Sequence, residues 1–238
     1  MAKFELDDYK QSGIAQRLNR SDMLDGFCFM LTMKWVVTCF CQNLKAPVAF
    51  NVHPDYDKVK KNHAIKAFHE VVTSDAICMQ LMDDHKEYMR RLRTEQFPIG
   101  NIREPVFANF TNSVRANYID VYEKSIAPNY FLVEEYLRKM DTQRRCKLLF
   151  CVADALPRDS YDILCPKGSG LLIHMQYTNQ NKNSAAHAIA IFHYIDKWFA
   201  VYDPNIGISV CDVAKVDLGL QAYMTNTVNF IIQGYRIT

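Results

Sequence analysis

The sequence contains no long apolar run: no segment approaches the roughly eighteen consecutive apolar residues that a membrane-spanning helix needs. Residues 1–19 also lack an apolar stretch preceded by positive charge, the mark of a Sec-type signal peptide. No tract of Lys and Arg is long enough to indicate nucleic-acid binding, and the formal net charge is only +2. We therefore expect a soluble protein with no transmembrane segment, no Sec signal and no nucleic-acid partner.

Disulfide and metal frameworks are also missing, although the 238 residues include eight cysteines. The cysteines lack the spacing of a disulfide scaffold, and several lie in apolar runs such as 148–152, where a free thiol behaves as a small hydrophobe. Cys39 and Cys41 have His53 and His63 downstream, but this spacing fits no common zinc arrangement. We expect a reducing compartment, no metal ion and no cofactor.

The hydrophobic period changes after Arg145. Before this residue the period is helical, and we expect helices at 29–43, within 56–96 as one helix or as two broken near 73–75, at 106–126 and at 129–140. After it the period is that of strands, which we expect at 147–153, 170–177, 186–202 as a hairpin, 208–211 and 228–235. Helices first and strands second indicate an α+β fold.

No repeat, linker or low-complexity tract divides the chain, so we predict a single domain over residues 1–238. Residues 1–20 would be a flexible lead or a short helix, 21–145 a helical lobe, and 146–238 a lobe built on an antiparallel sheet. The cleft between the two lobes is the expected substrate site.

The hairpin expected at 186–202 carries a histidine and ends on an acid. Folding it about residue 195 places His187 directly opposite Asp203, with their Cβ atoms about 5 Å apart. A carboxylate that holds an imidazole fixes its tautomer and stabilises the imidazolium, which is the orienting half of a catalytic triad. On these residues alone an alternative stays open, in which His187 is a hydrogen-bonded core histidine and Asp203 a turn residue.

Cys28 is expected at or just inside the start of the helix at 29–43. The unpaired amides and the helix dipole there favour an anion and lower the pKa of a thiol. Gly26, just upstream, allows a positive φ or a close approach of backbone. A cysteine at a helix start, followed far downstream by a histidine and an acid on adjacent strands, is the order of nucleophile, general base and orienting acid in a papain-like site.

Three blocks give this order a more specific form: Gly26-x-Cys28-x-x-Leu31-x-x-x-Trp35-Val36, His187-Ala188 and, sixteen residues past the histidine, Asp203-Pro204-Asn205-x-Gly207. Together they resemble the YopT/AvrPphB family of papain-like cysteine proteases, which are bacterial effectors delivered into host cells. The resemblance implies a papain-like, two-lobed α+β fold with Cys28 as nucleophile, His187 as general base and Asp203 as its orienter. It also implies a host protein as substrate, such as a small GTPase or a kinase, and delivery into the host cytoplasm by a bacterial secretion system.

The chain departs from the papain-like pattern just before the cysteine. Such sites usually carry an Asn or Gln a few residues upstream that donates into the oxyanion hole, but positions 22 and 23 are Asp and Met. The backbone amide of Cys28 can serve as one donor, and Asn19 or Gln16 is a candidate for the other.

Two further functions fit the same residues. A thiol, an imidazole and an acid in this order also suit a glutamine deamidase or an acyltransferase, because the thiolate can attack a side-chain amide or accept an acyl group. A non-catalytic binding protein that keeps the fold is the third hypothesis, suggested by the missing oxyanion side chain.

Overall fold

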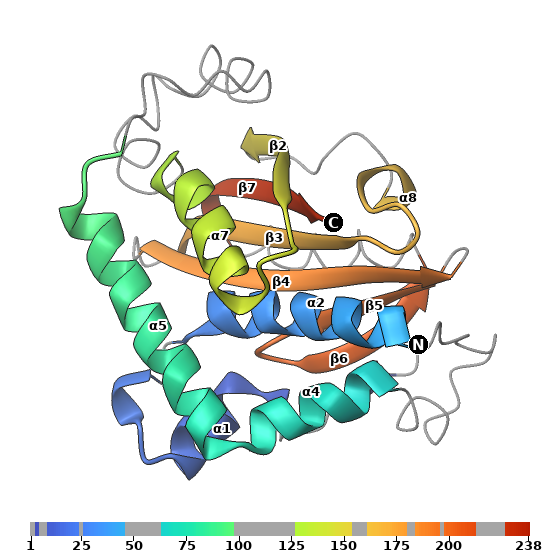
Figure 1. Ribbon diagram of the computed structural model, residues 1–238. Helices are drawn as coiled ribbons and strands as arrows, with labels where there is room; N and C mark the ends of the chain where they lie inside the picture. The colour runs from blue at the N-terminus through green and yellow to red at the C-terminus, as the bar shows by residue number, and fades with distance from the viewer. Residues whose placement is uncertain are drawn as a thin grey trace.

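The computed structural model describes residues 3–4, 9–23, 26–45, 63–97, 127–153, 161–179, 184–195, 198–212 and 227–238. In these ranges helices pack against an antiparallel sheet of seven strands (Figure 1). The fold is therefore α+β, as the sequence predicted.

The described helices follow one another along the first two thirds of the chain: α1 (Gln11–Arg17), the 3-10 helix η2 (Ser21–Met23), α2 (Cys28–Lys45), α4 (His63–Thr73), α5 (Asp75–Thr94), α7 (Ala127–Met140) and α8 (Tyr161–Leu164). The helical pattern expected within 56–96 is broken at Ser74, whose hydroxyl accepts a hydrogen bond from the Ile77 N–H and caps α5. Of the two alternatives, two helices broken near 73–75 is the correct one. The helix expected at 106–126 lies outside the described residues.

Helix α7 corrects one expected boundary. We expected this helix to begin at residue 129, but α7 begins at Ala127 and contains Pro128 in its first turn. A proline is tolerated there because the first N–H groups of a helix have no intrahelical acceptor.

The sheet has the order β1-β6-β5-β4-β3-β7-β2, with every neighbouring pair antiparallel. Its strands are β1 (Lys3–Phe4), β2 (Cys146–Ala153), β3 (Gly170–Asn179), β4 (Ser184–Ile195), β5 (Trp198–Asp203), β6 (Gly207–Asp212) and β7 (Thr227–Ile237). All strands expected after Arg145 are present. Strand β1 and helix α8 were not expected.

The hairpin of β4 and β5 is paired two positions away from the predicted register. Ala190 pairs with Tyr202, which the prediction had placed opposite Ala188. The strands meet at Ile195 and Trp198, with a bulge after His193, so the centre of the turn lies beyond residue 195. A shift of two keeps each side chain on its face of the sheet. Continuing this register places Asp203 diagonal to position 187 instead of directly opposite.

Helix α2 lies in the middle of the molecule, alongside β4 and enclosed by α4, α5 and α7 (Figure 1). The face of α2 that carries Cys28, Leu31, Trp35 and Cys39 packs inward, because all four residues are buried. The enclosure explains why the helix is apolar on nearly all sides. It also fixes the first turn of α2, where Cys28 lies.

Candidate active site

The structure brings Cys28, His187 and Asp203 together. Nε2 of His187 lies 2.9 Å from Oδ1 of Asp203, and the Cys28 side chain lies close enough to His187 to interact with its ring. The exposed fractions of the three residues are 8%, 2% and 7%. The thiol, imidazole and carboxylate therefore form one buried chain of contacts, while their catalytic roles stay a prediction.

The contact with Asp203 determines which ring nitrogen faces the thiol. A carboxylate only accepts hydrogen bonds, so Nε2 of His187 carries a proton and donates it to Asp203. Nδ1 is then the nitrogen that can exchange a proton with Cys28. The diagonal arrangement on β4 and β5 is sufficient for this bond, although the predicted register had the two residues directly opposite.

The charged form of the His187 ring is stabilised by its neighbours. Burial alone would lower the pKa of His187, but hydrogen bonds to Asp203 and Cys28 outweigh it and hold the pKa above its ordinary value. The ring of His174 on β3 differs from that of His187, because burial is the dominant effect on it and lowers the pKa of His174 to about 4. Of these two rings, His187 is thus the one whose charged form is favoured by its neighbours.

The carboxylate is held by a turn between β5 and β6. The Asn205 N–H donates to Asp203 Oδ1 at 2.9 Å, and the Ile206 N–H donates to the Asp203 carbonyl at 2.9 Å. These bonds make an Asx turn, and Gly207 follows with a φ of +113°. Asn205 and Gly207 thus shape the turn that carries Asp203.

Two buried rings fix the residue after Cys28. Phe29 stacks on Tyr88, with ring centroids 4.7 Å apart, and meets His174 edge-on at 5.5 Å. Tyr88 Oη donates to Asn129 Oδ1, and Asn129 Nδ2 lies 3.0 Å from Nδ1 of the neutral His174. This network ties α5, α7 and β3 to the first turn of α2, next to Cys28.

Gln11, which the sequence analysis did not consider, reaches the start of α2. It is 6% exposed, and its Oε1 accepts a hydrogen bond of 3.1 Å from the Phe27 N–H. The candidate oxyanion donors Gln16 and Asn19 are both exposed, and no hydrogen bond joins their side chains to residues 26–28 in the described part of the chain. The spacing of residues around Cys28 gave no indication of Gln11, because Gln11 lies on the preceding helix, at the start of α1.

Gly26 provides the room for this side chain. Its φ is +122°, and a Cβ atom added there would lie 3.0 Å from Oε1 of Gln11. The positive φ expected at Gly26 is confirmed, and the group that approaches it closely is the Gln11 side chain.

Gly26→Ala is therefore expected to lower the free energy of unfolding by about 2–3 kcal/mol, because it adds a contact with Gln11 to the cost of the positive φ. Urea denaturation measures the loss. Gly168→Ala is the matched control, since Gly168 has a φ of +78° with no atom within 4 Å of the added Cβ. It should lose only about 1 kcal/mol; an equal or greater loss than for Gly26→Ala would contradict the assigned contact.

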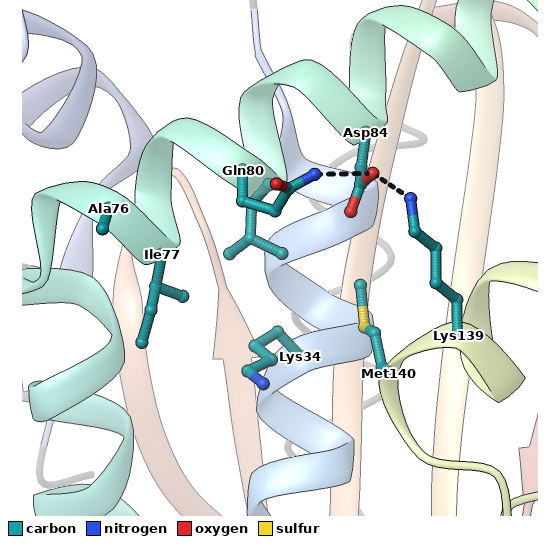
Figure 2. A pocket seen from close by; sticks show the side chains of 8 residues that line it. Lys34, Ala76, Ile77, Gln80, Asp84, Lys139 and Met140 are labelled. Atoms are coloured by element: carbon teal, nitrogen blue, oxygen red, sulfur yellow. Dashed lines mark hydrogen bonds and ion pairs between the residues drawn. The ribbon is translucent and has the colours of Figure 1, made fainter.

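A separate pocket of about 400 Å³ lies between α2, α5 and α7. Figure 2 shows Gln80 and Lys139 bonded to Asp84 at one side of this pocket, while the side chain of Lys34 on α2 points away from Asp84. Cys28, His187 and Asp203 do not line it. The substrate cleft expected between the lobes is therefore not this pocket, and it stays a prediction.

Two findings concern the described ranges as a whole. None of their helices combines the length and apolarity needed to cross a bilayer. Within the same ranges, no cluster of three or more His, Cys, Asp or Glu side chains could hold a metal ion.

Comparison with known proteins gives one similar structure. No family model and no curated protein matches the chain. Among solved structures, the chain is similar to the crystal structure of the Pseudomonas avirulence protein AvrPphB, with a TM-score of 0.44 and 12% sequence identity. The match covers 89% of this chain and 91% of that one. At this level the similarity assigns no role to any residue.

Proposed function

We propose that the protein is a cysteine protease in which Cys28 is the nucleophile, His187 the general base and Asp203 the orienting acid. The observation that carries the proposal is the unbroken contact from thiol to imidazole to carboxylate, at the start of a buried helix. The order of the three blocks, which resembles that of the YopT/AvrPphB family, adds independent support from the sequence.

The reaction follows from the geometry. Cys28 gives its proton to Nδ1 of His187, and the thiolate attacks the carbonyl carbon of a peptide bond. The backbone N–H of Cys28, among the first in α2, is placed to donate to the resulting oxyanion. His187 then gives its proton to the leaving amine, which leaves a thioester on Cys28. Water hydrolyses the thioester, with His187 accepting its proton, and the free enzyme is restored.

The proposed substrate is a host protein, such as a small GTPase or a kinase. This class follows from the resemblance to bacterial effectors. A protease of this kind would act in the host cytoplasm after delivery by a bacterial secretion system.

The function is tested by treating host-cell lysate with wild-type and Cys28→Ala protein and labelling new protein N-termini. Termini produced only by the wild type support the proposal. Cys41→Ala is the matched control, because Cys41 lies on the same helix but is exposed, and it should give the wild-type termini. Identical termini from wild type and Cys28→Ala would refute proteolysis.

The same samples separate the protease from its alternatives. A glutamine deamidase uses the thiolate on a side-chain amide, so its target would gain about 1 Da and stay intact. An acyltransferase would leave an acyl group on an intact target. Either result, in place of two fragments, would replace the protease with that activity at the same three residues.

A further inference from the structure

We propose that Gln11 is a positioning residue, which links the start of α2 to the Asp203 turn and thereby sets the distance between Cys28 and His187. The inference deepens the proposed function and rests on it. Gln11 lies on α1, outside all three sequence blocks that mark the site.

Gln11 makes three hydrogen bonds that join two distant parts of the chain. Its side-chain Oε1 accepts from the Phe27 N–H at 3.1 Å, and its Nε2 donates to Asn205 Oδ1 at 2.6 Å. Its backbone N–H donates to the Pro204 carbonyl at 2.8 Å. One residue thus holds both the amide next to the nucleophile and the turn that carries the acid.

These bonds close a ring with the catalytic contacts. Asn205 links Gln11 to Asp203, because the Asn205 N–H donates to the same Asp203 Oδ1 that accepts from His187. The complete ring runs through Phe27, Gln11, Asn205, Asp203, His187 and Cys28, and its two ends are consecutive residues. A change at any bond of this ring is therefore expected to alter the contact between Cys28 and His187.

The segment that carries Gln11 is held in place by burial and by a hydrogen bond. Ile14 and Ala15 on α1 are fully buried, and Tyr202 Oη on β5 donates to the Tyr9 carbonyl at 2.8 Å. The segment before α1 is therefore attached to the same strand that ends at Asp203. A residue can fix the position of other groups only if its own position is fixed by packing and hydrogen bonds.

The side-chain amide of Gln11 already has partners on both of its polar atoms. Nε2 bonds to Asn205, and Oε1 accepts from Phe27. We assign Gln11 a role through Asp203 and the start of α2, because these are the parts of the site that its side chain contacts. Misplacement of reacting groups by about 1 Å can cost about 100-fold in rate, so a positioning role has a measurable effect.

The test is the pH dependence of Cys28 alkylation by iodoacetamide, read by peptide mass spectrometry on the full chain. Gln11→Met keeps the length of the side chain and the backbone bond but removes both side-chain bonds. Its pH midpoint should rise by about 1 unit, which is a tenfold loss of rate on the acid side. Asn205→Leu removes the bond to Gln11 Nε2 and should shift the midpoint in the same direction, and the double variant should shift it no further than Gln11→Met alone, because Gln11→Met already removes that bond. Gln16→Met is the matched control: Gln16 is exposed on the same helix, and its profile should be that of the wild type.

Each other outcome overturns a defined claim. If Gln11→Met and Asn205→Leu, both folded by circular dichroism, keep the wild-type midpoint, Gln11 is not a positioning residue. Loss of peptide hydrolysis with an unchanged midpoint would likewise overturn it, since that pattern indicates an oxyanion donor. If Gln11→Met does not fold, Asn205→Leu decides in the same way. A wild-type Cys28 that titrates like an ordinary thiol would refute the proposed function itself, whatever Gln11 does.

Discussion

His187→Ala is expected to lower the kcat for peptide hydrolysis by about 10⁶-fold, since removal of the base of a catalytic triad costs nearly as much as removal of the whole triad. Without the ring, Cys28 loses both its proton acceptor and the donor to the leaving amine. The measurement is the turnover of a peptide that spans a cleavage site found in lysate.

The control is His193→Ala. His193 lies on the same strand and is equally buried, but its Nδ1 bonds to the Cys165 carbonyl at 2.7 Å and its ring stacks on Phe199. Its loss should lower stability and leave the turnover of the folded fraction within about tenfold of the wild type. Turnover by His187→Ala similar to that of His193→Ala would exclude His187 as the base.

Asp203→Ala has the second-largest expected effect, a loss of about 10⁴-fold in kcat, because the acid of a triad contributes less than the nucleophile or the base. The substitution removes the acceptor for His187 Nε2 and also the acceptor for the Asn205 N–H. Asp203→Asn keeps an oxygen in that place, and an Asn serves in the same role in papain-like proteases. It should therefore retain far more activity than Asp203→Ala, and equal losses would contradict an orienting role.

The same variant predicts a shift with pH. The bond to Asp203 raises the pKa of His187, so Asp203→Ala should lower that pKa. The imidazolium is then lost at a lower pH, and the alkaline limb of the pH–rate profile should move toward acid. A limb that stays in place, or moves toward alkali, would be inconsistent with the observed hydrogen bond.

Elements with a clear hydrophobic period could be predicted from the sequence. Helix α2 and strands β2 to β7 follow from the spacing of their apolar residues, because this spacing reflects which side chains are buried. The break at Ser74 follows from the capping chemistry of its side chain. Strand β1 and helix α8 are only two and four residues long, too short to show a period.

The candidate site could be predicted only as far as local pattern reaches. His187 and Asp203 share a face in any register of the same parity, so their contact withstood an error of two positions in the pairing. The approach of the Gln11 side chain to Gly26 could not be predicted. Gln11 meets Asn205 across nearly the whole length of the chain, and such a contact depends on tertiary packing that no local spacing encodes.

The most direct test of the account is the alkylation rate of Cys28 in the wild-type protein as a function of pH, with the exposed Cys41 as the internal reference. A thiolate paired with the His187 imidazolium predicts that Cys28 reacts at a nearly constant rate down to about pH 6, where ordinary thiols, with a pKa of about 8.5, are almost unreactive. A Cys28 whose rate falls tenfold per pH unit below about 8.5, as an unassisted thiol does, would contradict the account.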